Sequence, residues 1–360
     1  MFLQDLHSRA LPPLLPDGLT PAQWPARRKE LLTLFCREEY GFSPPAPASV
    51  HAQILESQPR KWAGKAEERV VSLGFDTPGG PFSFPVTLAL PHAGSPLPLV
   101  IYISFEPYPC GKYGPIEEIV DSGYALAVFC YEDVTRDIRS GWECTGLAPL
   151  YDRNDGAAWG QISMWAWAAS RVMDYAQTLD EVDKSRIYVV GHSRLGKMAL
   201  WCAAQDERFA GAGVNNSGFG GMAVTRDKQG ERMEDVPGSI DRWFCGNFLR
   251  YVNRAHEMPF DQHMLAALVA PRLLAVCNAE EDLWADPQSE FMSLYEADKA
   301  YRLLGVPGLI APAEYPPVGA QFTEGRIGYS LRAGTHFLSR HDWAFYLKFF
   351  NSHRIYEEKR

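Results

Sequence analysis

A short apolar strand that runs into a serine and then into a helix is the feature that most constrains this chain. Residues 187–190 form an apolar, partly β-branched run that is long enough for a buried parallel strand. Residues 191–193 interrupt that run, and residues 194–205 then have the apolar spacing of a helix. A serine at such a junction lies on a tight turn, and the helix-start amides point toward the group that its hydroxyl attacks. The pattern therefore predicts that Ser193 is a nucleophile, and the structural alternative is that it only caps the helix.

The rest of the chain repeats the alternation of strands and helices. Strands are predicted at 97–105, 124–130, 187–191, 210–215, 272–278 and 327–332, and helices at 116–122, 157–178, 194–205, 264–269, 288–304 and 341–351. This order predicts an α/β fold with a mostly parallel central sheet and helices on both faces. Ligands of such sheets bind at the carboxyl ends of the strands. The tryptophans at helical spacing in 157–178 are expected to be core residues.

The segments before and between these elements suggest how the chain is organised. Residues 1–60 are rich in proline and are expected to form an N-terminal extension whose helix, at about 22–40, packs on the domain. Residues 61–360 are expected to form one catalytic domain that starts with an antiparallel hairpin at 70–90. Residues 132–155 read as a long surface loop. The stretch 217–260 is expected to be an insertion that helps to roof the site.

Composition excludes some partners. The net charge of -9 argues against nucleic acid and anionic membrane surfaces, which both need a basic footprint. No apolar run approaches the roughly 20 residues of a membrane span. The seven cysteines are odd in number and contain no C-x-x-C pair, which favours a reducing compartment. No signal peptide is visible, so a cytoplasmic location is expected, with a secreted chain that has lost its leader as the alternative. The nine histidines have no metal-binding spacing, and neither a metal nor another cofactor is expected.

A nucleophilic serine needs a base and an acid, which follow it in the chain order nucleophile, acid, base in folds of this type. The acid should follow a strand, and four candidates follow the strand at 272–278: Glu280, Glu281, Asp282 and Asp286. Asp282 is the predicted acid because its short side chain lies about four residues past the strand end. The other three are expected to be helix-start or solvated residues.

The base should lie in a late loop before the last helix. His336 follows Gly334 in a predicted turn, whereas His341 opens the last helix, where a helix-start role is expected. His336 is therefore the predicted base. His192 is expected to pack behind the turn, and His263 is expected to be structural.

Beyond these single residues, residues 191–197 resemble the G-[CH]-S-R-x-G-K signature of the glucuronoyl esterases, carbohydrate esterase family 15. In this signature the second glycine, Gly196, comes three residues after the serine, unlike in G-x-S-x-G. Similarity continues at 203–209, 215–221, 243–248, 261–265, 280–287, 334–336 and 342–343, and covers roughly 95–350. The resemblance implies an α/β-hydrolase fold, which is a three-layer sandwich. It also implies hydrolysis of the ester between (4-O-methyl-)glucuronic acid of xylan, or of a xylo-oligosaccharide, and an alcohol such as lignin.

The resemblance also implies roles for individual residues. Ser193 would be the nucleophile, His336 the base and Arg194 the oxyanion residue. Some family members carry the acid directly after the strand that follows the nucleophile helix. Asn216 stands at that place here and cannot bear the charge, so Asp282 is the implied acid.

The expected contacts to the sugar come from the same resemblance. Lys197 and Glu231 would bind the sugar hydroxyls, and Trp284 would wall the ring. Ser239 lies near a place where many members have a polar amide, and it completes the expected substrate-binding set. Structural alternatives are that Lys197 is solvated, that Arg194 is an ion-pair partner, and that Trp284 is core. Two other functions also remain open, namely an esterase for acetyl-xylan or other small acyl esters and a catalytically idle carbohydrate-binding relative.

Overall fold

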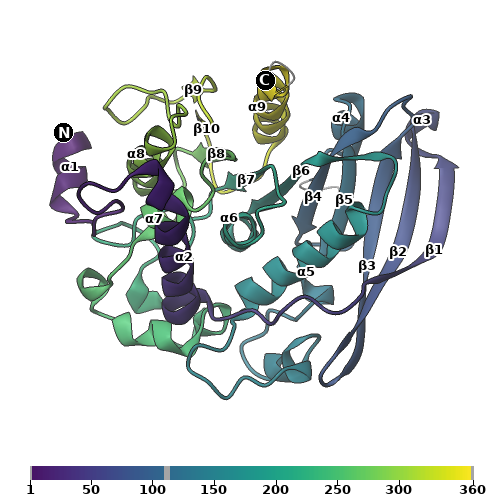
Figure 1. The fold of residues 1–360 in the computed structure, drawn as a ribbon, viewed down its shortest axis with the longest axis horizontal. Coiled ribbons are helices and arrows are strands. Elements are labelled where there is room, and N and C mark those ends of the chain that lie inside the picture. The colour runs from purple at the N-terminus through teal and green to yellow at the C-terminus, as the bar shows by residue number, and fades with distance from the viewer. Residues whose placement is uncertain (1, 109–113, 358–360) are drawn as a thin grey trace.

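The computed structural model describes residues 2–108 and 114–357, and a ten-stranded sheet lies at its centre. The strands follow the order β1-β2-β3-β5-β4-β6-β7-β8-β10-β9, from right to left in Figure 1. The neighbours from β5 to β10 in this order pair in parallel, whereas β1, β2, β3 and β9 pair antiparallel. The strands are β1 (His51–Arg60), β2 (Ala66–Thr77), β3 (Gly80–Pro91), β4 (Leu97–Ser104), β5 (Ala125–Cys130), β6 (Val182–His192), β7 (Gly211–Asn215), β8 (Leu273–Ala279), β9 (Gln321–Phe322) and β10 (Ile327–Arg332).

Helices cover both faces of this sheet. The core on one face receives side chains from α2, α5, α6, α7 and α8, and the core on the other face receives them from α4 and α9. The helices are α1 (Phe2–Ser8), α2 (Trp24–Phe35), α3 (Lys61–Gly64), α4 (Ile116–Asp121), α5 (Gln161–Ala176), α6 (Arg194–Gln205), α7 (Gln262–Ala267), α8 (Pro287–Leu303) and α9 (Arg340–Glu357), and a π-helical turn at Cys36–Tyr40 continues α2. The predicted three-layer α/β sandwich with a mostly parallel sheet is confirmed.

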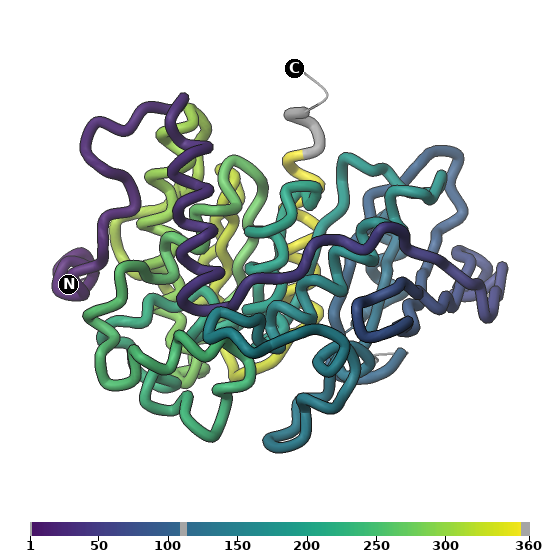
Figure 2. Tube along the Cα trace, turned by 60° about the horizontal axis from the view of Figure 1, so that its bottom comes forward, coloured from purple at the N-terminus to yellow at the C-terminus, as the bar shows by residue number. Residues whose placement is uncertain are grey.

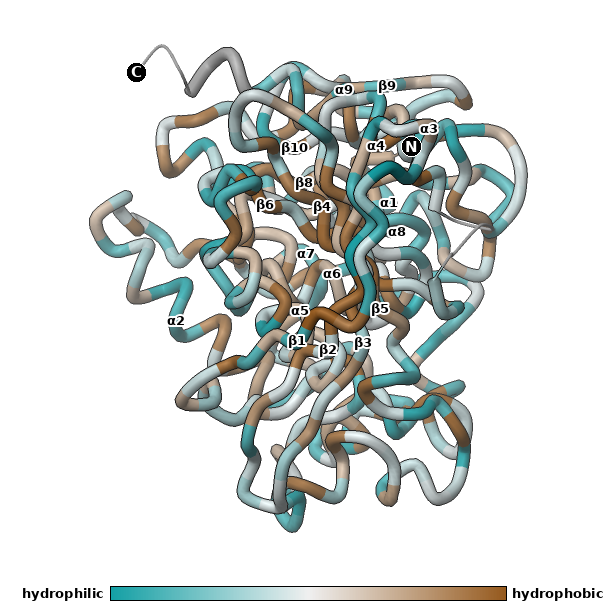
Figure 3. Tube along the Cα trace, turned by 90° about the vertical axis from the view of Figure 1, so that its right-hand side faces the viewer, coloured by the Kyte–Doolittle hydropathy of each residue, from teal (hydrophilic) through white to brown (hydrophobic). Residues whose placement is uncertain are grey.

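The alternation of side chains along the central strands explains why both faces are apolar. In β6, Ile187 and Val189 belong to the core under α5 and α6, while Tyr188 and Val190 belong to the core under α4 and α9. Figure 3 shows these hydrophobic strand segments at the centre of the molecule. Trp159 and Trp165 are also buried in the core, as predicted for the tryptophans at helical spacing.

The N-terminal segment differs from the expectation in one respect. Its helix α2 buries Trp24, Leu31 and Phe35, and the chain then crosses the molecule toward β1 (Figure 2). Strand β1 pairs with β2, so the last ten residues of the predicted N-terminal extension, His51–Arg60, already belong to the sheet. The sequence did not predict β1 because nine of its ten residues are exposed, which leaves no apolar alternation to detect.

The stretch 217–260 contains only short 3-10 turns, at Met233–Asp235, Asp241–Trp243, Gly246–Tyr251 and Ala255–Glu257. The expected surface loop at 132–155 likewise contains turns at Trp142–Cys144 and Ala148–Leu150. Both segments begin near the carboxyl ends of the parallel strands. They supply residues to the site described below.

Two observations concern the environment of the chain. Among the described residues, no helix has the length and apolarity that crossing a bilayer requires. Six cysteines of the described part are free thiols, and the seventh, Cys110, lies outside the described residues.

Candidate active site

Ser193 lies on a sharp turn between β6 and α6. Its φ is +57° and its ψ is -127°, which is a conformation that residues with a side chain rarely adopt. A Cβ atom on Gly191 would lie 2.0 Å from the carbonyl oxygen of Leu195, so the turn requires glycine there. The Ser193 side chain makes no capping hydrogen bond to α6. The alternative that this serine merely caps the helix therefore lacks its defining contact.

His336 and Asp282 form a close pair at the same edge of the sheet. Nδ1 of His336 lies 2.5 Å from Oδ2 of Asp282. The Asp282 side chain is 3% exposed and the His336 side chain 40%. The two loops start side by side because β8 and β10 are parallel neighbours, with Ala279 opposite Arg332. The pair thus joins a buried carboxylate to an imidazole that can reach solvent and substrate.

His192 links this pair to the serine turn. Its ring centre lies 4.5 Å from that of His336, and His192 directly precedes Ser193. Its Nδ1 lies 2.6 Å from Oδ1 of Asn215. Burial, and next the nearby His336, lower the pKa of His192 to about 3, so this imidazole stays neutral. The structure thereby brings the predicted base next to the predicted nucleophile turn.

The other three acidic candidates do not contact His336 in this way. Asp286 caps α8, where its Oδ1 accepts a hydrogen bond from Ser289 N at 3.2 Å and its Oδ2 accepts one from the Ser289 hydroxyl at 2.6 Å. Glu280 and Glu281 are exposed. Of these four residues, the structure thus pairs Asp282 with His336.

Two of the other histidines considered above, His341 and His263, lie in structural positions. His341 is exposed in the first turn of α9. His263 is fully buried, and its Nε2 lies 3.0 Å from the carbonyl oxygen of Pro12. Both positions agree with the structural roles expected for them.

Asn216 holds two of these loops together. Its Oδ1 accepts a hydrogen bond from Ala279 N at 2.9 Å, and its Nδ2 donates to the carbonyl oxygen of Phe337 at 3.3 Å. The residue therefore ties the end of β7 to the loop of the acid and to the loop of the base. An uncharged amide suits this role, because it has both a donor and an acceptor.

Arg194 is an ion-pair partner of Asp137, a residue that the sequence did not predict as part of the site. The Asp137 side chain is 1% exposed and accepts hydrogen bonds from Arg194 Nη1, from Arg242 Nε at 2.7 Å and from Trp243 Nε1 at 2.9 Å. The Arg194 guanidinium also lies 4.8 Å from the ring centre of Trp243. A buried carboxylate and an aromatic ring therefore hold the arginine beside the serine.

Lys197 has a different environment from the one expected. Its ammonium donates to Glu231 Oε2 at 2.9 Å, to the carbonyl oxygen of Ser217 at 2.7 Å and to that of Phe219 at 2.5 Å. An ammonium has three N–H donors, and these acceptors use all of them. The side chain is 4% exposed, so Lys197 is not a solvated helix residue. Its observed contacts are with protein groups, and it positions Glu231.

The other two expected sugar contacts lie in contrasting surroundings. Trp284 is 57% exposed, so its ring is not core. Its carbonyl oxygen accepts a hydrogen bond from Glu231 N at 3.0 Å, which fixes the two loops together. Ser239 is partly buried, and its carbonyl oxygen accepts a hydrogen bond from Arg242. Ser239 is thus connected to the Asp137 cluster through its backbone.

Glu290 of α8 is a fully buried carboxylate next to this site. It accepts hydrogen bonds from Gly218 N at 2.5 Å and from Asn278 Nδ2 at 2.8 Å. Burial raises the pKa of Glu290 to about 7. Oδ1 of Asn278 has no partner among the described residues, so flipping the amide lets this oxygen accept a hydrogen bond from the hydroxyl of a neutral Glu290.

This carboxylate should make folding stability depend on pH. A raised folded-state pKa stabilises the fold below the ordinary value of 4.5, and that contribution is lost as pH rises through about 7. We expect the free energy of unfolding of the wild type, relative to Glu290→Gln, to fall by about 2–3 kcal/mol between pH 5 and pH 8. Urea unfolding at both pH values measures this difference. Glu257→Gln is the exposed control, and parallel pH curves for wild type and Glu290→Gln would contradict the expectation.

In the part of the chain that the structure describes, no three His, Cys, Asp or Glu side chains form a group that could hold a metal ion.

Comparison with known proteins places this site in a family. Residues 76–305 match the family described as glucuronyl esterase, fungi. Carbohydrate esterase MZ0003, from an unknown prokaryotic organism, is 38% identical over 66% of this chain and 55% of its own. The 4-O-methyl-glucuronoyl methylesterase of Hypocrea jecorina is 30% identical over 80% of this chain and 59% of its own.

A solved structure covers more of the chain. The glucuronoyl esterase from Solibacter usitatus superposes with a TM-score of 0.88 and 32% identity over 95% of this chain and 97% of its own. The chain spans somewhat more than half the length of the curated relatives named above. The chain belongs to the glucuronoyl esterases, carbohydrate esterase family 15, within the α/β-hydrolases.

Proposed function

We propose that this chain hydrolyses the ester between a (4-O-methyl-)glucuronic acid, carried on xylan or on a xylo-oligosaccharide, and an alcohol. The observation that carries the proposal is the contact between His336 and Asp282 beside the strained Ser193 turn. The name of the Hypocrea jecorina relative, a 4-O-methyl-glucuronoyl methylesterase, supports this substrate class.

The proposed chemistry follows from the tautomer that the pair selects. The Asp282 carboxylate accepts a hydrogen bond from Nδ1–H of His336 and so keeps the proton on Nδ1, which leaves Nε2 with a free electron pair. Nε2 removes the proton of the Ser193 hydroxyl while Oγ attacks the uronate carbonyl carbon. The alcohol leaves with that proton, and an acyl-enzyme remains. Water then attacks the acyl carbon with the same imidazole as base and releases the uronic acid.

In this mechanism Arg194 stabilises the charge on the carbonyl oxygen. Its guanidinium stays next to Ser193 because Asp137 binds it. Donors that are held in place before the reaction stabilise the transition state without reorganising. The Arg194 side chain is 31% exposed, so part of it is accessible from solvent.

The proposed role of Arg194 can be tested by mutation, with the neighbouring Arg242 as the control. We expect Arg194→Gln to lower kcat for a glucuronate ester by about 10²–10³-fold with a small change in KM, since the stabilised charge exists only in the transition state. Arg242→Gln removes the other guanidinium on Asp137 and should lower the melting temperature with a smaller effect on kcat. Equal kcat losses in the two variants would show that both act only through the fold.

Three residues are proposed to bind the sugar. Glu231 would accept hydrogen bonds from its hydroxyls, held in place by Lys197, and the exposed ring of Trp284 would pack against its face. Ser239 would bind the sugar through its hydroxyl, and the hydrogen bond from Arg242 to its carbonyl oxygen would hold it in place.

A broader esterase activity is the second candidate, because all three Lys197 donors are engaged by the protein. Lys197 therefore adds less to uronate selection than the family resemblance implies. The decisive experiment compares kcat/KM for benzyl glucuronate with that for p-nitrophenyl acetate and acetylated xylan. We expect the glucuronate ester to be preferred at least about tenfold, which corresponds to 1.4 kcal/mol. A preference for the acetyl esters would favour the second candidate.

We also propose that the chain works in a reducing compartment such as the cytoplasm. Support comes from the six free thiols of the described part, five of which are buried. Activity recovered mainly from a periplasmic or culture-medium fraction of the native cells would contradict this location.

A further inference from the structure

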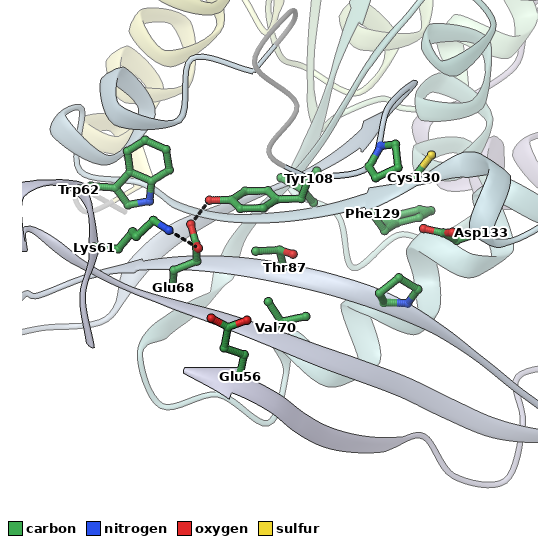
Figure 4. A pocket seen from close by; sticks show the side chains of 13 residues that line it. Glu56, Lys61, Trp62, Glu68, Val70, Thr87, Tyr108, Phe129, Cys130 and Asp133 are labelled. Carbon is green, nitrogen blue, oxygen red and sulfur yellow. Dashed lines mark hydrogen bonds and ion pairs between the residues drawn. The ribbon is translucent and has the colours of Figure 1, made fainter. Parts of the chain in front are cut away.

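A second pocket lies on the sheet, away from the serine. It has a volume of about 410 Å³, within the usual range of ligand pockets. Strands β1, β2, β3 and β5 form its floor, and the turn at α3 and the chain after β4 form its walls (Figure 4). None of the residues proposed for catalysis or for sugar binding at the serine site lines it.

The floor of this pocket is set by strand register. Glu56 pairs with Val70, Val70 with Thr87, and Thr87 with Val128. Residues directly opposite in neighbouring strands point to the same face of a sheet, so these four side chains form one continuous row. A floor built from four paired strands is rigid, which favours a preformed ligand site.

One end of the pocket holds a buried carboxylate that the fold does not require. Glu68 is 6% exposed, its Oε1 lies 3.0 Å from Lys61 Nζ, and its Oε2 accepts a hydrogen bond from the Tyr108 hydroxyl. The Lys61 side chain is 39% exposed, and ion pairs that reach solvent contribute little to stability. This polar cluster therefore points to recognition of a polar ligand.

Trp62 stands at the same end of the pocket, near Tyr108, whereas Asp133 lies at the opposite end (Figure 4). The backbone of Trp62 and that of Ala63 have φ values of +53° and +57°, a strained conformation for residues with a Cβ. The indole Nε1 is buried and has no hydrogen-bond partner in the described part of the chain. The pocket thus combines an aromatic side chain with a buried donor that no group of residues 2–108 or 114–357 satisfies.

We propose that this pocket binds a neutral oligosaccharide. The rings of Trp62 and Tyr108 would pack against the C–H faces of a sugar ring. The carboxylates of Glu56 and Asp133 would accept hydrogen bonds from its hydroxyls.

Charge and polarity decide between ligand classes. The pocket has three carboxylates, from Glu56, Glu68 and Asp133, and a single ammonium, from Lys61, so it disfavours a uronate or another anion. A purely apolar ligand would leave these polar groups desolvated without partners. A chain of neutral pentoses or hexoses can pack against both aromatic rings, and its hydroxyls can donate hydrogen bonds to the carboxylates. The choice of xylan as the chain to test rests on the proposed function.

The test measures binding of xylohexaose by calorimetry to the full chain carrying Ser193→Ala. Trp62→Ala and Glu56→Gln are added singly, with Asp76→Asn as a control, since Asp76 is an exposed carboxylate of β2 outside the pocket. We expect both pocket variants to weaken binding at least about tenfold and Asp76→Asn to leave it unchanged. Glu56→Gln keeps the test sound if Trp62→Ala does not fold. Absence of binding to the Ser193→Ala chain, or unchanged affinity in both pocket variants relative to that chain, overturns the proposal.

Hydrolysis of benzyl glucuronate separates this inference from the proposed function. In the background with Ser193 intact, both pocket variants should hydrolyse this small ester at the wild-type rate. A wild type that binds xylohexaose through the pocket and fails to hydrolyse the ester would refute the proposed function and leave the pocket assignment standing. A fall of ester hydrolysis in both folded pocket variants would assign the pocket residues to the catalytic site and overturn the separate site.

Discussion

Ser193→Ala is expected to lower kcat for benzyl glucuronate by about 10⁴–10⁶-fold, because alanine removes the only atom that can form the acyl-enzyme. Alanine keeps the Cβ of serine, so the turn with φ +57° gains no additional strain. The missing hydroxyl makes no capping hydrogen bond to α6 that the fold would lose. The variant should therefore fold like the wild type, and the kinetic loss should report chemistry.

Two controls make the Ser193 result interpretable. Ser185→Ala removes an exposed hydroxyl in the first half of β6, and it should leave kcat unchanged. Circular dichroism melting curves of both variants should overlay that of the wild type within a few degrees. Retention of more than about one hundredth of the wild-type kcat in Ser193→Ala would mean that another group attacks the ester.

Asp282→Asn should have the next largest effect, a fall in kcat of about 10³–10⁴-fold. The carboxylate only accepts hydrogen bonds, so it fixes the Nδ1–H tautomer of His336. An amide can donate to Nδ1 instead, which would place the proton on Nε2 and abolish its function as a base. The reaction would then also lack the buried negative charge that stabilises the imidazolium.

Asp286→Asn is the matched control in the same loop. Asp286 caps α8 through Ser289, and its Oδ2 also accepts a hydrogen bond from Gln229 N at 3.0 Å. Asparagine keeps the cap and loses one of these acceptors, so this variant should lower stability while kcat stays close to wild type. The ratio of the kcat values of the two variants is the measurement. A larger loss in Asp286→Asn than in Asp282→Asn would reverse the assignment of the acid.

The sheet was predictable from the sequence because its central strands are buried on both faces. Runs such as 99–103 and 125–130 are apolar throughout, which identifies strands without any tertiary information. Strand β1 has no such pattern, since pairing with β2 holds it in place and its side chains lie in solvent. Strand β9 has only two residues, too few for any periodicity.

The sequence predicts the site residues whose positions are set by the strands and turns directly beside them. The Ser193 turn is encoded by its own glycines, and the places of Asp282 and His336 follow from the strands that precede them. Asp137 was not predictable, because it meets Arg194 from 57 residues away, and the long turn-rich segment that carries it has no period.

The surroundings of Lys197 were not predictable for a related reason. Its acceptors include two backbone carbonyls, and a carbonyl carries no sequence signal. The sequence shows which side chains are present. Which acceptor each donor binds depends on how the backbone packs, and this cannot be read from composition or spacing.

Trapping the acyl-enzyme tests most directly whether Ser193, activated by His336 and Asp282, carries the reaction. The enzyme is mixed with excess benzyl glucuronate, quenched in acid within milliseconds, digested and mapped by mass spectrometry. We expect one glucuronoyl adduct, located on Ser193 in the wild type and absent when His336 is replaced by alanine. A wild type that hydrolyses the ester while the adduct lies on another residue would contradict the proposed mechanism.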